Sequence, residues 1–267
     1  MKKIIINADD YGLTPSVSKG IRNAHLNGIL TSTTAMATGF SIENDAKLLI
    51  NECPFLGVGV HLTLTSVPSV LPKNQISTLV NNNGDFFSIK ELIANNESID
   101  EIELYNEWKA QIEKLLTLGL SIGHLDSHHY VCYLNKKTIN VMIKLAKEYN
   151  FSVRAPASPN RCETLKRDAE SLLNKEGIKF PSIFYDDFTK QEGELNVLLE
   201  LLRFDNNPAN IEILSHAGIV DSLLEEISSL THSRETELKS LCDEKIINLV
   251  NESADIQLTT FKKMFNN

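Results

Sequence analysis

The sequence predicts an α/β fold, a distorted (β/α) TIM-like barrel with mostly parallel strands. Three observations carry this prediction. Short apolar runs alternate with amphipathic stretches along the chain, which is the order of strand–helix units. About seven such units are present, a number that suits a barrel-like sheet, although a doubly wound open sheet remains an alternative. No G-x-G-x-x-G or G-x-x-x-x-G-K-S/T motif follows the first apolar run, which weakens a dinucleotide or nucleotide site.

Each element follows from the spacing of the apolar residues. Short apolar runs predict strands, and apolar residues that recur every three or four positions predict helices. The expected strands are 4–6, 32–37, 57–64, 120–125, 151–154, 182–185, 211–214 and 256–258. The expected helices lie within 17–24, 43–50, 102–115, 139–146, 195–204 and 234–250.

Composition excludes several classes of protein. The chain has 267 residues, 42% of them hydrophobic, which is enough to bury a large core. It carries 26 basic and 35 acidic residues, a net charge of −9, without a Lys/Arg cluster, so neither nucleic acid nor an anionic membrane surface is an expected partner. The four cysteines are far apart and form no C-x-x-C pair, which indicates free thiols in a reducing compartment. With no apolar run of roughly 18 residues, we expect a cytoplasmic protein; the sequence leaves its oligomeric state open, a homodimer included.

One segment interrupts the strand–helix rhythm. Residues 66–96 contain Pro68, Pro72, three consecutive asparagines and Gly84. A long excursion of this kind is often functional. We therefore expect a single domain over residues 1–267, with 66–96 as a lid over its site.

Polar side chains suited to metal binding follow several of the predicted strands. Because the carboxyl ends of parallel strands meet at one edge of a sheet, these side chains are expected to line one pocket. They are Asp9, Asp10, His61, Asp126, His128, His129 and His216.

Each of these residues also has a purely structural interpretation. Asp9 and Asp10 could form a turn and a helix N-cap, or they could serve as one metal ligand and one neighbouring base. His61 alone could be a buried strand histidine. Since side chains alternate along a strand, only one of His128 and His129 is expected to face the site, with Asp126 and His128 on one side.

One carboxylate with two histidines is a common set of ligands for a divalent metal. This set suits Zn²⁺, Fe, Mn or Co, whereas completion by several waters suits Mg²⁺. The chain contains neither an H-E-x-x-H motif nor a G-x-S-x-G motif, so a zincin-type protease and a serine hydrolase are unsupported.

Several motifs together resemble the YdjC-like carbohydrate deacetylases, the family that includes chito-oligosaccharide deacetylases. The resemblance spans nearly the whole chain. The motifs are NADDYG from Asn7, TSTTAM from Thr31, GVGVHLTLT from Gly57, HLDSHH from His124, SVRAP around Arg154 and LSHAGIVD from Leu214, with Arg234, Glu235 and Leu238 further on.

The resemblance implies a distorted (β/α) barrel that holds one divalent metal, Mg²⁺ in the family, with Zn²⁺ plausible from the ligand types. The implied ligands are Asp10, His61 and His128. Asp9 would be the catalytic base. Arg154 and His216 would match the positions that orient the base and protonate the leaving amine in related polysaccharide deacetylases. The implied reaction removes N-acetyl groups from acetylated amino sugars or short chito-oligosaccharides and releases acetate.

The chain departs from the family pattern at three positions. Tyr130 and Cys132 replace histidines, and Ala217 stands where the family usually has proline, a change expected to loosen the loop that carries the proposed acid. These changes bear on the substrate more than on the reaction type.

Two rival functions stay open. A metal-dependent phosphoesterase would need more carboxylates and more basic residues than Arg154 alone supplies at the strand ends. A non-catalytic sugar-binding protein on the same barrel would not need the Asp base beside a complete ligand set. As substrate we expect a small neutral acetylated oligosaccharide, on whose ring Phe86 and Phe87 could stack unless they only anchor the lid.

Overall fold

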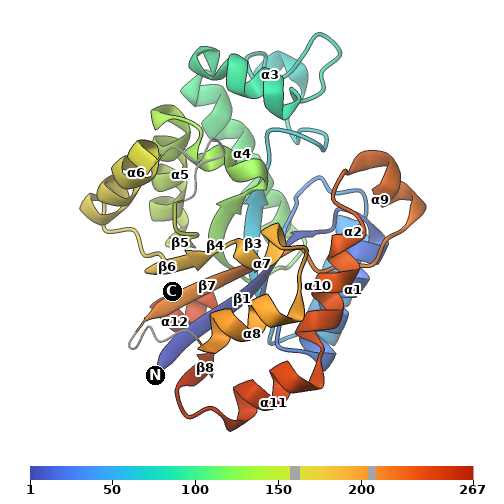
Figure 1. Ribbon diagram of the computed structural model, residues 1–267. Helices are drawn as coiled ribbons and strands as arrows, with labels where there is room; N and C mark the ends of the chain where they lie inside the picture. Colours follow the sequence, from blue (N-terminus) through green and yellow to red (C-terminus); the bar gives the residue numbers. More distant parts are fainter. Residues whose placement is uncertain (157–162, 204–208, 267) are drawn as a thin grey trace.

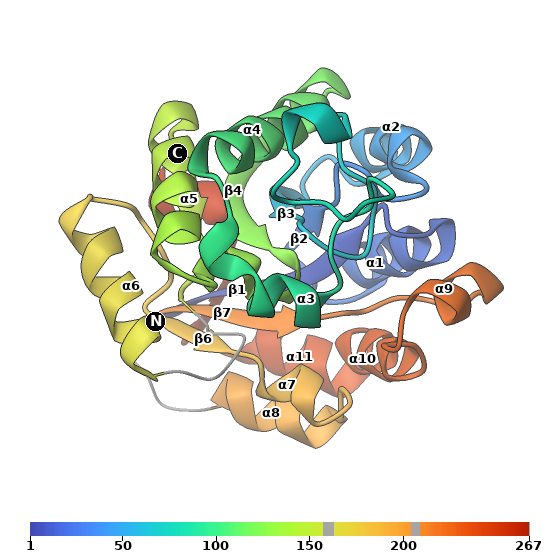
Figure 2. The ribbon, with the colours of Figure 1, turned by 90° about the horizontal axis from the view of Figure 1, so that it is seen from above.

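The structure is a computed structural model that describes residues 1–156, 163–203 and 209–266. A curled sheet of parallel strands occupies the centre, and helices surround it (Figures 1 and 2). The strands are β1 (Lys2–Tyr11), β2 (Ser32–Ala35), β3 (Gly57–Leu62), β4 (Ile122–Ser127), β5 (Ser152–Val153), β6 (Ile183–Tyr185), β7 (Asn210–Ser215) and β8 (Ile256–Leu258).

The strand order confirms the barrel-like α/β prediction. It runs β5-β4-β3-β2-β1-β7-β6, with β8 paired to the start of β1. From β1, therefore, the sheet proceeds in chain order to β5 on one side and back through β7 to β6 on the other. This is the order of a (β/α) barrel that is opened between β5 and β6.

Helices cover the outside of this curled sheet (Figure 2). The longer ones are α1 (Pro15–Asn27), α2 (Ile42–Glu52), α4 (Glu101–Thr117), α5 (Lys136–Tyr149), α6 (Glu163–Lys175), α8 (Leu195–Arg203), α10 (Ser233–Leu241) and α11 (Glu244–Glu252). The shorter ones are α3 (Ile89–Ala94), α7 (Asp187–Lys190), α9 (Ser222–Ile227) and α12 (Phe261–Phe265).

All the strands expected from the sequence are present, with ends that differ by a few residues. The single helix expected over 234–250 is wrong, because the structure has two helices there. The first ends at Leu241 with Cys242 as its C-cap, and the carboxylate of Asp243 caps the second by accepting the Lys245 N–H. The helices α3, α6, α7, α9 and α12 were not expected. Residue 204, expected at the end of a helix, lies outside the described residues.

The interior of the barrel is closed at its amino-terminal end by α12. Ile5 of β1 packs against Phe261 and Met264 of that helix. The buried His124 of β4 stacks on Phe261 with ring centroids 3.7 Å apart. A Cβ at Gly59 would lie 2.4 Å from the His124 ring, so only glycine fits beside it. His124 is therefore a core histidine, and the polar chemistry lies at the opposite end of the strands.

The segment between β3 and α4 packs down on the rest of the fold. Buried side chains such as Ile76, Leu79 and Phe86 join the main core. The carboxylate of Glu107 accepts the N–H groups of Val70 and Leu71. The segment therefore has its own anchors, and movement of it as a lid stays a prediction.

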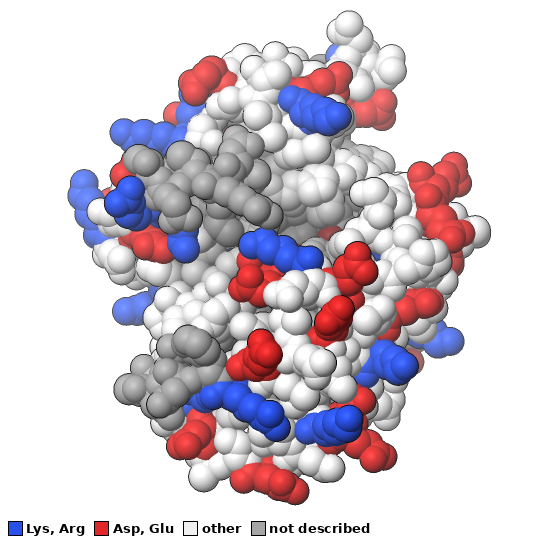
Figure 3. All heavy atoms as spheres, in the orientation of Figure 1, with Lys and Arg blue, Asp and Glu red and all other residues white. Residues whose placement is uncertain are grey.

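Two surface properties bear on possible partners. In the view of Figure 3, Lys and Arg side chains are interspersed with Asp and Glu and form no basic patch. None of the helices that the structure describes is both long enough and apolar enough to cross a membrane.

The described cysteines, Cys53, Cys132 and Cys242, are free thiols, and Cys162 lies outside the described residues.

Candidate active site

A cavity of about 490 Å³ opens at the carboxyl ends of β1, β3, β4 and β7. Six of the seven candidate residues line it together, as the parallel sheet predicts. They are Asp9, Asp10, His61, His128, His129 and His216, and Asp126 does not line it.

The backbone of β1 turns both adjacent aspartates into this cavity. Side chains of a regular strand alternate between its two faces. At Asp10, however, φ is 71°, and the register of β1 against β2 shifts between Ala8 and Tyr11. Thr14, and neither aspartate, caps α1 by accepting the Val17 N–H, so the N-cap interpretation is wrong.

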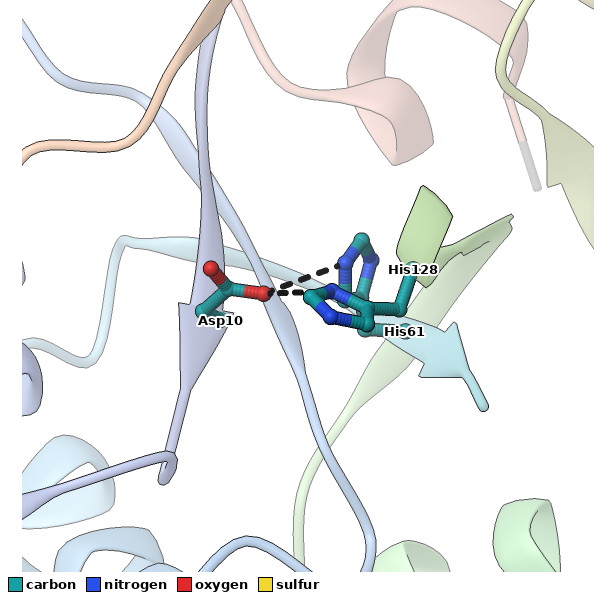
Figure 4. A group of neighbouring side chains, drawn as sticks. All are labelled: Asp10, His61 and His128. Carbon is teal, nitrogen blue, oxygen red and sulfur yellow. Dashed lines mark hydrogen bonds and ion pairs between the residues drawn. The ribbon is translucent and has the colours of Figure 1, made fainter. Parts of the chain in front are cut away.

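Asp10, His61 and His128 form a compact cluster from three strand ends (Figure 4). Asp10 Oδ1 lies 3.3 Å from His61 Nε2 and 3.1 Å from His128 Nδ1. One ligand atom from each residue lies within 4.8 Å of the other two. Asp10 and His61 are almost fully buried, so the cluster is a desolvated carboxylate–imidazole set of the kind that binds divalent transition metals.

The surroundings of His61 also fit a metal ligand. Its Nδ1 lies 2.6 Å from Asp126 Oδ1. A carboxylate on one imidazole nitrogen fixes the proton there and leaves the other nitrogen free to bind a cation. Burial would lower the pKa of His61, but Asp126 and Asp9, with hydrogen bonds to Asp10 and Asp126, raise it to about 10. Cation binding at Nε2 therefore has to displace a proton.

Asp9 lies beside this cluster and is held by four hydrogen bonds. Arg154 donates to both carboxylate oxygens, at 2.7 and 2.8 Å, and Asn7 and Thr34 donate to Oδ1 at 2.9 and 3.1 Å. Its Oδ2 lies 3.8 Å from His61 Nε2. Burial alone would raise the pKa of Asp9, but Arg154, followed by His61, holds it well below its usual range. Asp9 is therefore an ionised and weakly basic carboxylate.

Arg154 contacts Asp9 from behind and does not line the cavity. Besides Asp9, its guanidinium reaches two more buried carboxylates, with Nε 2.8 Å from Glu212 Oε1 and Nη2 2.9 Å from Asp126 Oδ2. Burial raises the pKa of Glu212 to about 7 against the lowering effect of Arg154. The fixed guanidinium determines how Asp9 faces the cavity.

His216 follows β7 and lines the cavity. In the sheet, β7 lies on one side of β1, whereas β3 and β4, at whose ends His61 and His128 lie, are on the other side. Burial lowers its pKa to about 4, against the opposing effect of Asp9 and Asp10, so its imidazole is neutral at rest near pH 7. The expected loosening by Ala217 is not what the structure shows. The Ala217 N–H donates to Ser215 Oγ at 3.0 Å, a hydrogen bond that proline could not make.

Both His128 and His129 line the cavity, so the expectation that only one would face the site is wrong. Strand alternation does not apply, because β4 ends at Ser127 and residues His128–Tyr133 form a 3₁₀ turn. His129 and Tyr130 in that turn have φ values of 54° and 55°. His129, one of the candidates, and Tyr130, which was not, thus both form part of the wall of the site.

Other residues of the site were also missed or misplaced from sequence. Arg234 lines the cavity and donates to Asp10 Oδ2 at 2.6 Å. Of the 66–96 segment, Ser66 and Ile89 line the cavity, whereas Phe86 and Phe87 pack on the core, which favours their interpretation as anchors. Glu212 carried a usable signal, since a charge inside the buried run NIEILS requires a buried partner.

Comparison with known proteins identifies relatives over nearly the whole chain. The family profile described as "YdjC-like protein" matches residues 3–252. The curated carbohydrate deacetylase of Thermoanaerobacter pseudethanolicus is 34% identical over 98% of both chains. A putative cellobiose-phosphate cleavage protein from Enterococcus faecalis has a TM-score of 0.87 at 30% identity, over 98% of both chains.

A more distant structure shows the same fold. A peptidoglycan N-acetylglucosamine deacetylase has a TM-score of 0.51 at 15% identity, over 99% of this chain and 88% of its own. This similarity concerns the fold alone. The chain belongs to the YdjC-like family of carbohydrate deacetylases.

Proposed function

We propose that the chain is a metal-dependent hydrolase that removes N-acetyl groups from short acetylated amino-sugar oligomers and releases acetate. The observation that carries the proposal is the position of Asp9, an ionised carboxylate whose Oδ2 lies 3.8 Å from the Nε2 of His61 in the cluster of Asp10, His61 and His128. A base and a ligand set are thus side by side in one cavity.

The cluster would hold one divalent ion through Asp10, His61 and His128. An ion bound there would act as a Lewis acid, polarising the acetyl carbonyl and lowering the pKa of water from 15.7 toward 7. The two imidazoles favour Zn²⁺ or another transition metal by ligand type, and Mg²⁺ remains the choice implied by resemblance.

The roles of the protein groups follow from their protonation states. Asp9 takes a proton from the attacking water as the new C–O bond forms. Because Arg154 makes Asp9 a weak base, this transfer requires water that is already acidified, and we expect activity to depend fully on the metal. His216 is neutral at rest, so it must first receive the proton that Asp9 has taken from the attacking water. It then donates that proton to the sugar nitrogen as the C–N bond breaks.

The walls of the cavity support a neutral substrate. Among the described residues that line the cavity, Arg234 is the only lysine or arginine, and it already pairs with Asp10. A phosphate group would find no free guanidinium or ammonium there, which disfavours the phosphoesterase alternative. A non-catalytic sugar-binding protein has no use for a buried, oriented Asp9 beside the ligand set.

Acetate release from diacetylchitobiose is the direct test. The purified protein should release acetate and a free amine in equal amounts. A chelator should stop the reaction, and re-addition of Zn²⁺ or Mg²⁺ should restore it. Release that persists after verified removal of all metal would overturn the metal dependence, and hydrolysis of a sugar phosphate ester instead would overturn the reaction class.

A further inference from the structure

We propose that Glu237 is a positioning residue that fixes the proposed acid His216 through its peptide N–H. The proposal rests on the proposed function, because it concerns the group that protonates the leaving amine. Glu237 is fully buried on α10 and is absent from the lining of the cavity, so it acts through His216 and does not contact substrate.

The side chain of His216 lacks an anchor of its own. Its Nδ1 is buried and has no hydrogen-bond partner among the described residues. In contrast, Asp126 holds the ring of His61 through Nδ1, and Asp10 and Ser66 contact the ring of His128. The direction of the His216 ring is therefore set by its packing and by its backbone.

That backbone has just left the sheet. The register of β7 with β1 ends at Ser215, which pairs with Ala8. Oε2 of Glu237 accepts the His216 N–H in a short hydrogen bond. Burial raises the pKa of Glu237 to about 7, and its carboxyl oxygen can accept this N–H in either protonation state.

Helix α10 holds this peptide from more than one side. Arg234 donates to the carbonyl oxygen of His216 at 3.4 Å, and the Arg234 carbonyl accepts the Gly218 N–H at 3.2 Å. Because the same guanidinium binds Asp10, α10 links the acid to a proposed metal ligand. The Glu237 side chain is confined in turn, since a Cβ at Gly193 would lie 2.3 Å from its Cγ.

The test compares two substitutions of similar shape. Glu237→Met removes the acceptor oxygen, whereas Glu237→Gln keeps one oxygen that can accept the His216 N–H. A small displacement of a catalytic group costs on the order of 10²-fold. We expect Glu237→Met to lower kcat on diacetylchitobiose by about 10- to 100-fold with little change in KM or metal content, and Glu237→Gln to recover part of that loss. The exposed Glu244 at the start of α11 provides the control Glu244→Gln, with wild-type kcat.

A double-mutant cycle separates positioning from a general structural role. If Glu237 acts through His216, adding Glu237→Met to His216→Ala should lower kcat no further. Equal losses in both backgrounds, or a wild-type kcat for Glu237→Met, would overturn the inference while leaving the proposed function intact. A wild-type protein that releases no acetate, or a fully active His216→Ala variant, would instead overturn the proposed function or the acid role, and this inference with it.

Discussion

The substitution Asp9→Asn tests the division of roles between the two adjacent aspartates. Four donors point at the carboxylate of Asp9, three of them at Oδ1. The asparagine oxygen can satisfy those three, which leaves its amide nitrogen opposite Nη1 of Arg154. Arg154 keeps its contacts with Asp126 and Glu212, so the guanidinium is not left without a counter-charge.

The expected magnitudes differ for stability and for catalysis. Loss of one hydrogen bond between charged groups should lower the free energy of unfolding by about 1.5–3 kcal/mol. Loss of a general base should lower kcat by about 10²–10⁴-fold, or about 2.7–5.4 kcal/mol at 1.36 kcal/mol per factor of ten. Metal content should not change, because Asp10 and the two histidines are untouched.

Three measurements on one preparation check this prediction: acetate release from diacetylchitobiose, metal content by elemental analysis and thermal unfolding. Asp255→Asn, an exposed change before β8 at the opposite end of the sheet, is the matched control. A folded Asp9→Asn protein that loses its metal would make Asp9 a ligand. One that keeps full kcat would show that Asp9 is not the base.

Further predictions follow from the same geometry. His61→Ala or His128→Ala should lower metal content and activity together, and full metal occupancy in either variant would show that the ligand assignment is wrong. Kinetics on neutral N-acetylglucosamine oligomers and a 6-phosphorylated analogue should favour the short neutral sugars; a preference for the phosphorylated sugar or for insoluble chitin would contradict this. Because burial raises the pKa of Glu212 from 4.5 to about 7, the folded state holds a proton that the unfolded chain releases, and stability should fall as the pH rises through that interval. The free energy of unfolding of Glu212→Gln, measured in urea, should vary less with pH over this interval than that of the wild type. An equal pH dependence in the two proteins would contradict this prediction.

The sequence was sufficient to predict the sheet and the place of the site because both follow from local patterns. Apolar runs mark the strands, and the carboxyl ends of parallel strands meet at one edge, so Asp10, His61 and His216 could be expected together. The roles of the residues came from resemblance, and they stay proposals. Alternation failed at His129 because no pattern in HLDSHH shows that the strand ends at Ser127.

The supporting charges were harder to predict for a physical reason. Periodicity identifies apolar faces, but it does not identify which charged side chain of a helix is buried by a distant strand. Arg234 and Glu237 lie one helical turn apart on α10 and contact residues of β1 and of the loop after β7. Those contacts depend on how the helix packs, which is a property of the whole fold.

Buried carboxyl groups around the site outnumber the guanidinium groups that pair with them. The carboxyl groups belong to Asp9, Asp10, Asp126, Glu212 and Glu237, and the guanidinium groups to Arg154 and Arg234. Such an excess of like charge opposes folding, and the protons that His61 and Glu212 hold offset only part of it. A divalent ion should therefore act as a folding ligand: at 100 times its Kd it would add about 2.7 kcal/mol to the stability of the native state. The chemistry and the folding of this protein should then share one dependence on metal supply, and metal-starved cells should contain less of the protein as well as less of its activity.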